Sequence, residues 1–227
     1  MNFYGAFFKW MQAIVRIFHP KYSVHIPNEK GPVVYVCHHQ NLFGPFITML
    51  WFPKSIHMWV LHVFLDQSSC FQHYSDYTFT KRFKWNKVLA KICASPISFF
   101  IPKLLNSARS IPVYRGSRRI VTTFKQSIEA LLAGEKMVIC PDIDYSDPSS
   151  TTKEMYDGFL FLEKYFYQKT GKHLCFIPIY VSRRKRGIVA DQKIYFSDGK
   201  SFNEERKVIY KMIQTNLNDL AKKCGDV

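Results

Sequence analysis

Apolar runs and amphipathic stretches alternate along most of the chain. Four short runs, at 33–37, 111–114, 137–140 and 176–181, have the length and composition of buried strands. Helical periodicity is present at 118–133, ahead of Gly134, and again after Ser201, where Ser-Phe-Asn-Glu has the form of a capping box. This alternation predicts an α/β fold, a single domain whose mixed or mostly parallel sheet is flanked by helices.

Residues 3–19 have a different pattern. Projected on a helix, the polar positions form one narrow stripe, made of Gly5, Lys9, Gln12, Arg16 and His19. The rest of the surface is apolar or aromatic, and the two basic residues interrupt it too early for a membrane-spanning helix. We therefore expect residues 1–20 to form an amphipathic helix at a membrane interface, followed by an α/β domain at 21–227. Packing of this helix into the protein's own core is the alternative.

Composition and charge narrow the classes of partner. The chain has 227 residues, of which 47% are hydrophobic, and this suits one well-buried core. Lys and Arg number 32 against 17 Asp and Glu, a formal net charge of +15, so an acidic partner is expected. An anionic membrane surface, an acidic carrier protein and nucleic acid all qualify. We expect no nucleic acid, because no zinc-finger, RNP or helix-turn-helix pattern is present.

Cysteine and histidine positions add little chemistry of their own. The six cysteines lack Cys-x-x-Cys spacing and several lie in apolar runs, which indicates free thiols in a reducing compartment. His57, His62 and His73 lack the spacing of metal ligands, and we expect no metal. The basic cluster at 182–187 lies between two strand-like runs, as the tip of a hairpin would, and is either a solvated turn or part of an anion-binding surface.

The first predicted strand ends in a polar segment. Residues 35–45 read Tyr-Val-Cys-His-His-Gln-Asn-Leu-Phe-Gly-Pro, which places a titratable base at the end of a strand, where α/β sheets present reacting groups. From His39 onward this segment resembles the first motif of the glycerophosphate and lysophospholipid acyltransferases, which runs His, four residues, Asp. Gly44 stands where that family keeps its Asp.

Three later segments resemble the other motifs of the same family. Ile-Pro-Val-Tyr-Arg-Gly at 111–116 resembles the second, in which an Arg helps to hold the acceptor's phosphate. Met-Val-Ile-Cys-Pro-Asp-Ile-Asp at 137–144 resembles the third, in which a strand runs into Pro-Glu-Gly-Thr-Arg; Pro141 is kept and Asp142 is a shortened Glu. Phe-Ile-Pro-Ile-Tyr-Val at 176–181 resembles the fourth. The series covers most of the chain.

The resemblance implies a glycerolipid acyltransferase-like fold and an enzyme of phospholipid biosynthesis, peripheral on the cytoplasmic face of a membrane. It would move an acyl group from acyl-CoA or acyl carrier protein to a lysophospholipid-like or other lipid acceptor, with no cofactor beyond that co-substrate. The expected catalytic residues are His39 as general base, with Asp142 and Asp144 as candidates to orient its imidazole. The expected substrate-binding residues are His38, Asn41, Gly44, Arg115, Gly116 and Pro141.

The absent Asp leaves a second hypothesis open, a catalytically silent relative that binds lipid or a lipid-synthesis enzyme. Loss of the orienting carboxylate from a Ser-His-Asp triad costs about 10⁴ in rate. Alternatively, Gly44 leaves room for a bulkier acceptor, or for an amine whose own nucleophilicity demands less of the base.

Overall fold

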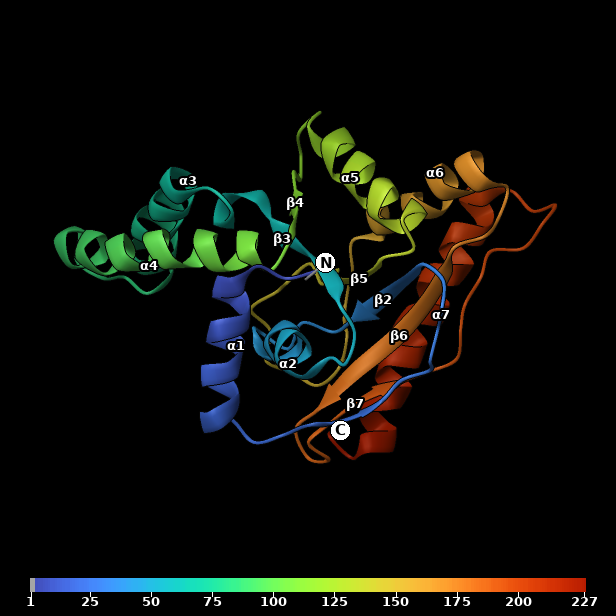
Figure 1. Cartoon of the computed structure of the whole chain (residues 1–227), viewed down its shortest axis with the longest axis horizontal. Helices are drawn as coiled ribbons and strands as arrows, with labels where there is room; N and C mark the ends of the chain where they lie inside the picture. The colour runs from blue at the N-terminus through green and yellow to red at the C-terminus, as the bar shows by residue number, and fades with distance from the viewer. Residues whose placement is uncertain (1–2) are drawn as a thin grey trace. The chain divides into compact units, whose positions relative to one another are not determined.

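Strand β2 (Val33–Cys37) lies between two parallel neighbours in the computed structural model, which describes residues 3–227 (Figure 1). It pairs with β6 (Cys175–Ser182) on one side and with β5 (Lys136–Ile139) on the other. Every residue of β2 and β6 is buried, which is why their sequences are apolar at consecutive rather than alternate positions. The strands predicted at 33–37, 137–140 and 176–181 are thus confirmed.

The sheet continues beyond β6 with a single antiparallel pair. Strand β7 (Gly187–Ala190) runs antiparallel to β6, and β1 (Ser23–His25) pairs parallel with β7. These five strands lie in one of two compact units into which the chain divides; this unit, here called unit 2, comprises residues 15–56 and 124–227. The predicted α/β class with a mostly parallel sheet is confirmed.

Helices cover the strands of unit 2. They are α2 (Phe43–Trp51), most of α5 (Ile120–Leu132), the 3₁₀ helix Asp157–Leu160, α6 (Phe161–Thr170) and α7 (Phe202–Cys224). Figure 1 shows α7 along one side of β6, where Leu220 and Ala221 pack on Tyr180, while α2 contacts β6 from the other side. The predicted helices at 118–133 and after Ser201 are confirmed.

The expected capping box at the start of α7 does not form. Ser201 occupies the N-cap position, but its side chain makes no capping hydrogen bond. Instead Glu205, which is buried one residue beyond the capping-box position, accepts the backbone N–H of Ser197 with both carboxylate oxygens. The acidic side chain in the first turn of α7 therefore accepts a backbone N–H from the preceding loop, at Ser197, and not the N–H of the N-cap residue Ser201. The helix ends at Gly225, whose φ of +77° suits glycine.

Unit 1 comprises residues 1–14 and 57–123, as far as they are described. Strand β4 (Ile111–Val113), the predicted second-motif strand, pairs parallel with β3 (Ile56–Leu61). Between them lie the 3₁₀ helix His62–Phe64, α3 (Gln67–Gln72), the π-helix η2 (His73–Arg82) and α4 (Lys87–Ser107). The α4 helix starts at Asn86, whose side-chain oxygen accepts the N–H of Val88 at 2.8 Å.

The predicted N-terminal helix is α1 (Ala6–Phe18). Phe8 is its one buried side chain, while Trp10, Ile17 and Phe18 are exposed, so the helix is not a core element. Arg16, a member of the predicted polar stripe, donates from Nε to the carbonyl of Leu50 at 2.8 Å. Part of the polar stripe therefore contacts the protein, and large apolar side chains of α1 face outward.

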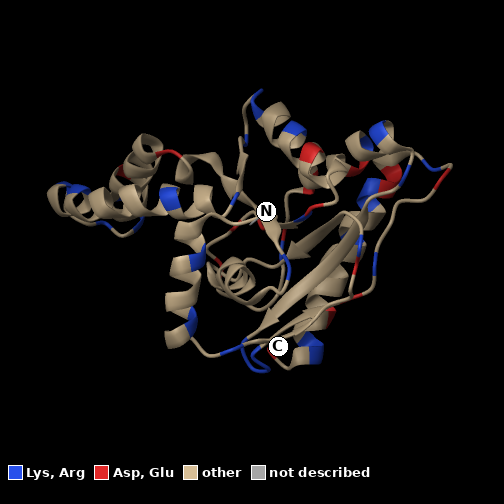
Figure 2. Cartoon of the chain, viewed as in Figure 1, with Lys and Arg blue, Asp and Glu red and all other residues tan. Residues whose placement is uncertain are grey.

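The basic cluster at 182–187 forms the tip of the β6–β7 hairpin, as its flanking runs predicted (Figure 2). Its cations are partly engaged by the end of α7. Arg184 donates from Nη1 to the carbonyl of Gly225 at 3.0 Å, and Lys185 Nζ donates to the carbonyl of Lys223 at 2.7 Å. Cations at a helix C-terminus satisfy carbonyls that have no partner within the helix and complement the helix dipole. The cluster is therefore more than a solvated turn.

Candidate functional site

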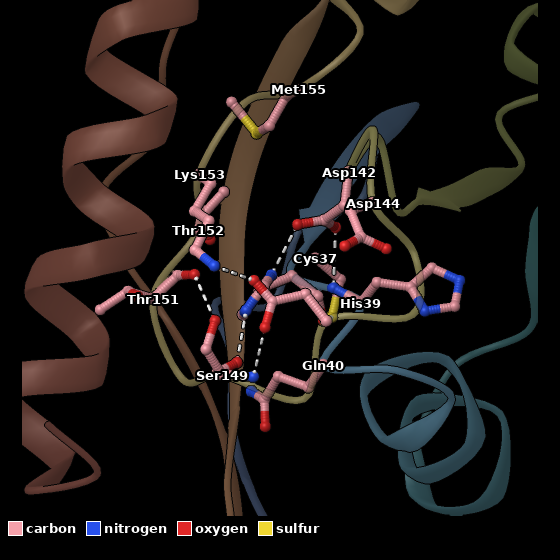
Figure 3. Close-up of polar contacts among 12 residues, drawn as sticks. Cys37, His39, Gln40, Asp142, Asp144, Ser149, Thr151, Thr152, Lys153 and Met155 are labelled. Carbon is pink, nitrogen blue, oxygen red and sulfur yellow. Dashed lines mark hydrogen bonds and ion pairs between the residues drawn. The ribbon is translucent and has the colours of Figure 1, made fainter.

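Two parallel strands bring the histidine pair and Asp142 together. Strands β2 and β5 are in register with Val36 opposite Ile139, so the residues that follow each strand emerge at the same edge of the sheet. Asp142 Oδ1 lies 2.6 Å from Nδ1 of His38, and Asp142 Oδ2 accepts the backbone N–H of His39 at 2.8 Å (Figure 3). The His38 side chain is 2% exposed and that of Asp142 is 5% exposed. One buried carboxylate thus fixes both histidines.

The second ring nitrogen of His38 is also engaged. Its Nε2 lies 2.9 Å from the carbonyl oxygen of Ser149, which is an acceptor only. A hydrogen bond here requires a hydrogen on Nε2, whichever of His38 and Asp142 holds the proton shared between them. The ring consequently has no lone pair at Nε2 with which to take a proton in this conformation. We assign His38 as a positioning residue.

His39 has different surroundings. Its imidazole is half-buried and points away from the Asp142 carboxylate (Figure 3), and its ring centroid lies 6.0 Å from that of Tyr145. From the sequence, Asp142 or Asp144 was expected to orient the ring of His39; the structure instead places Asp142 on the ring of His38 and on the backbone of His39. Adjacent residues leaving a strand point in different directions, and residue order alone does not say which one meets the carboxylate.

The turn after His39 is held in an uncommon backbone conformation. Gln40 and Asn41 have φ values of 47° and 61°, in the left-handed region that non-glycine residues rarely occupy. Gln40 is buried and donates from Nε2 to the carbonyl of Val181, and the N–H of Asn41 donates to the carbonyl of Asp147 at 2.8 Å. Such strain persists only where surrounding contacts impose it, and it is concentrated at functional sites.

Gly44 is a packing requirement of this turn. A Cβ atom added to it would lie 2.1 Å from the carbonyl oxygen of His38, which is far inside contact distance. The family's Asp therefore has no room at this position. The suggestion that Gly44 leaves space for a bulkier acceptor is wrong, because the His38 backbone already occupies that space and Gly44 is buried.

A loop from 143 to 154 borders a cavity of about 380 Å³. The cavity is lined by His38, Asp142, Ile143, Asp144, Asp147, Lys153 and Glu154. Asp144 accepts hydrogen bonds from the hydroxyl and backbone N–H of Ser146, which lower the pKa of its carboxyl. Asp147 pairs with Lys153 at 2.7 Å, and this contact together with the Ser149 N–H lowers the pKa of Asp147 to about 2. Both carboxylates are therefore ionised at neutral pH.

Helix α7 fixes this loop over His38. The side chain of Asn218 accepts the N–H of Thr152 at 2.7 Å and donates to its carbonyl at 3.2 Å. The hydroxyl of Tyr210 accepts the N–H of Met155, which also forms a bridge with Asp142. The Ser149 carbonyl is consequently held against His38 by contacts at both ends of the loop.

The remaining predicted residues divide between the units. Pro141 is buried beside Asp142, and its carbonyl accepts the N–H of Tyr156 at 2.8 Å. Arg115 and Gly116 lie in unit 1, in an exposed turn just after β4, where Gly116 has a φ of +67°. In the same turn Arg119 donates to the hydroxyl of Tyr114 and covers its ring, whereas Arg118 is exposed.

Sequence reasoning missed Asp147, Ser149 and Lys153. They lie in the polar Asp-Pro-Ser-Ser-Thr-Thr loop and its continuation, a composition that indicates a turn without indicating what the turn contacts. Across residues 3–227, no group of three or more His, Cys, Asp or Glu side chains is arranged to hold a metal ion.

Comparison with known structures shows the fold. The chain is similar to the crystal structure of the 1-acyl-sn-glycerophosphate (LPA) acyltransferase PlsC from Thermotoga maritima, with a TM-score of 0.51 and 14% sequence identity, over 94% of this chain and 79% of that one. No protein-family model matches the chain, and no curated protein sequence matches it significantly. The likeness establishes that this chain has an α/β fold of the kind seen in a glycerolipid acyltransferase.

Proposed function

We propose that this protein is an acyltransferase that moves a fatty acyl group from acyl-CoA or acyl carrier protein to a lysophospholipid-like or other lipid acceptor. The observation that carries the proposal is the position of His39, fixed by Asp142 at the carboxyl edge of a sheet with this fold. A base at that edge is placed where α/β enzymes perform their chemistry. The resemblance of the four sequence segments is an independent reason for the same activity.

In the proposed reaction His39 acts as general base. Its imidazole takes the proton of the acceptor hydroxyl or amine as the acceptor oxygen or nitrogen bonds to the acyl carbon. The bond between that carbon and the thioester sulfur then breaks, and the proton passes to the departing thiolate. Arg115 is proposed to bind an acceptor phosphate, because a guanidinium can donate two parallel hydrogen bonds to phosphate oxygens.

The buried pair of His38 and Asp142 supports His39 through the backbone. Asp142 accepts the His39 N–H with one oxygen and contacts the His38 ring with the other, so the position of the strand exit depends on both. Supporting contacts of this kind hold a catalytic group in productive geometry. Asp144, which lines the cavity, is proposed to shape the site rather than to transfer a proton, because its carboxylate is engaged by Ser146.

A membrane-bound acceptor fits the surface of the chain. The net charge of +15 favours an anionic leaflet and also the phosphates of coenzyme A or an acidic carrier protein. Helix α1 exposes Trp10, Ile17 and Phe18, side chains that suit the boundary between headgroups and acyl chains. We therefore propose a peripheral location at the cytoplasmic face of a membrane.

One observation favours a second candidate, a silent relative that binds lipid without turnover. Gly44 cannot be replaced by the Asp that would orient the ring of His39 in the family's motif, since the His38 carbonyl fills that position. Loss of an orienting carboxylate costs about 10⁴ in rate where nothing replaces it.

One assay separates the acyltransferase from the silent relative. Acyl transfer from acyl-CoA and from acyl carrier protein to a panel of lysophospholipids is measured by mass spectrometry. We expect an acylated product with the wild-type protein and a loss of about 10² to 10⁴ in rate for His39→Gln. Circular dichroism checks that this variant is folded. Equal rates for the two proteins would overturn the base assignment, and binding of lysophospholipid without product would establish the silent relative.

Arg115→Gln, compared with Arg118→Gln from the same exposed turn, tests the proposed phosphate contact. A rise in KM confined to the Arg115 variant and to acceptors that carry a phosphate is the expected result. Equal KM values for the two variants would contradict this role for Arg115.

A further inference from the structure

The hairpin of η2 and α4 in unit 1 presents large apolar side chains to solvent. At its end, residues 81–89 are all exposed. We call the exposed apolar and aromatic residues here the tip patch, which consists of Tyr77, Phe83, Trp85, Val88, Leu89 and Ile92.

The α4 helix buries and exposes the opposite kinds of side chain from an ordinary surface helix. Its buried positions are small or polar, namely Ala90, Ala94, Ser98 and Pro102, and they recur every four residues. Several of its large apolar residues are exposed, with Val88 67%, Ile92 63% and Phe99 54% exposed, whereas Ile97 packs against the small core of the hairpin. A surface helix in water normally buries its large apolar side chains and exposes polar ones. This inversion points to an apolar environment for the outer face.

The tip patch is held by a folded platform. Phe79 is buried with Ala90 and Ala94, and its ring stacks on that of Trp85 with centroids 4.7 Å apart and planes 5° apart. Asn86 caps the start of α4 through its side chain. The exposed residues beside this small core are therefore presented by defined structure.

Basic positions are interspersed with the patch along this end of the hairpin, where Figure 2 shows segments coloured as Lys and Arg. The stretch 77–92 contains five of them and no acidic residue; they are Lys81, Arg82, Lys84, Lys87 and Lys91. Asp76 immediately precedes the stretch and accepts the hydroxyl of Ser75. Exposed apolar and aromatic side chains interspersed with cations match the boundary between acyl chains and anionic headgroups. The five basic residues of this stretch favour an anionic partner over a neutral one.

We propose that the tip patch docks on an anionic lipid bilayer, as a membrane contact separate in sequence from α1. Val88, Leu89 and Ile92 would enter the acyl-chain boundary, while the lysines and Arg82 contact lipid phosphates. The α4 helix has the length and hydropathy of a membrane-crossing helix, but its buried small-residue face packs within the hairpin, which favours docking over crossing. The inference deepens the proposed function by naming a surface that brings the enzyme to lipid acceptors, and it does not depend on turnover.

Co-sedimentation of the full chain with vesicles tests this docking. The vesicles are phosphatidylcholine alone or phosphatidylcholine mixed with phosphatidylglycerol. The double variant Val88→Gln, Ile92→Gln is compared with Val121→Gln, since Val121 is 68% exposed on α5 and outside the patch. We expect the double variant to bind mixed vesicles at least about tenfold more weakly, because two apolar side chains no longer leave water. Val121→Gln should bind as the wild type does.

A second double variant, Lys87→Gln with Lys91→Gln, tests the contribution of charge separately. It should bind the mixed vesicles more weakly and bind vesicles of phosphatidylcholine alone as the wild type does. Undiminished binding of the Val88, Ile92 variant, or no binding of the wild type to either vesicle, would overturn the proposal. So would a wild-type dimer in sedimentation that the double variant loses, since the patch would then join two copies. His39→Gln should keep vesicle binding, which distinguishes failure of docking from failure of the proposed catalysis.

Discussion

His38 and His39 are neighbours in sequence with different environments. His38 is buried between the Asp142 carboxylate and the Ser149 carbonyl, whereas the half-buried ring of His39 points away from both. Because the His38 ring contacts the Asp142 carboxyl group at 2.6 Å in the interior, its loss leaves a buried polar group without one of its hydrogen-bond partners.

We therefore expect His38→Ala to destabilise the protein by about 1–3 kcal/mol, the usual cost of leaving a buried hydrogen-bonding group without its partner. Asp142→Asn should be less harmful, since an amide is neutral and can still accept the His39 N–H. Urea unfolding monitored by circular dichroism gives both values. An unchanged unfolding midpoint for His38→Ala would show that the pair contributes nothing to stability.

Gly44 provides a second prediction at the residue scale. Gly44→Ala places a methyl group 2.1 Å from the His38 carbonyl, and relief requires the strand exit to shift. Overpacking of this kind costs about 1–3 kcal/mol or more. Gly31→Ala is the matched control, because no atom lies within 4 Å of its added Cβ. Thermal unfolding should show a clear loss for the Gly44 variant alone, and equal midpoints would mean that the turn adapts without cost.

At the scale of elements, a cluster of ionisable groups joins α6 to the start of β6 and to the loop before α7. His173 lies 2.6 Å from Glu163 through Nδ1 and 3.1 Å from Asp198 through Nε2, and Glu163 also accepts the N–H of Leu174. Burial opposes charging of His173, but the hydrogen bonds and charges of Glu163 and Asp198 outweigh it and raise the pKa of His173. Burial raises the pKa of Glu163, although His173 acts against this.

The raised pKa of His173 makes the stability of the protein fall as pH rises. The folded state binds the proton more tightly than the unfolded state, so this stabilisation is complete below the ordinary value of 6.5 and is lost as pH rises through the higher folded value. The group is partly exposed, so we expect an effect of about 1 kcal/mol or less.

The free energy of unfolding, measured in urea at about pH 6 and about pH 8, should therefore fall with pH in the wild type and fall less in His173→Gln. His25→Gln, an exposed histidine in β1, is the control and should behave as the wild type. The same pH dependence in wild type and His173→Gln would show that His173 does not cause the change in stability with pH.

At the scale of the whole molecule, charge and exposed apolar surface act together on membrane binding. Deletion of 3–19 would also remove buried Phe8 and the Arg16 contact with Leu50, so it would disturb the fold as well as the surface. The double variant Ile17→Gln, Phe18→Gln changes the surface of α1 without removing a buried side chain, because both residues are exposed. Each fully buried large apolar side chain contributes roughly 1.5–3 kcal/mol, which exceeds the ~1 kcal/mol of one cation near an anionic leaflet.

We expect high salt to release the wild type from anionic vesicles only in part, and the Ile17, Phe18 variant to bind both anionic and neutral vesicles more weakly. Val208→Gln, an exposed position on α7, is the control. Co-sedimentation at low and high salt measures these differences. Complete release of the wild type by salt would mean that charge alone attaches the protein.

The sequence by itself determined the α/β class and the principal elements of the fold. Consecutive apolar residues in β2 and β6 predicted strands buried on both faces, and the 3.6-residue period predicted α5 and α7. It also placed His39 at the end of a strand, and the order of the resembling motifs named Asp142 and Asp144 as candidates to orient its imidazole. These are local properties, which a period or a strand end expresses directly.

Only the tertiary structure decided how those residues are connected. Which histidine meets Asp142 depends on the direction of each side chain at the strand exit, and the Ser149 contact depends on a loop held by α7, more than sixty residues further along the chain. The exclusion of a side chain at Gly44 follows from a turn that brings it onto the His38 carbonyl, and the outward apolar face of α4 follows from what packs on its other side. These features arise from contacts between distant segments, and no local pattern specifies them.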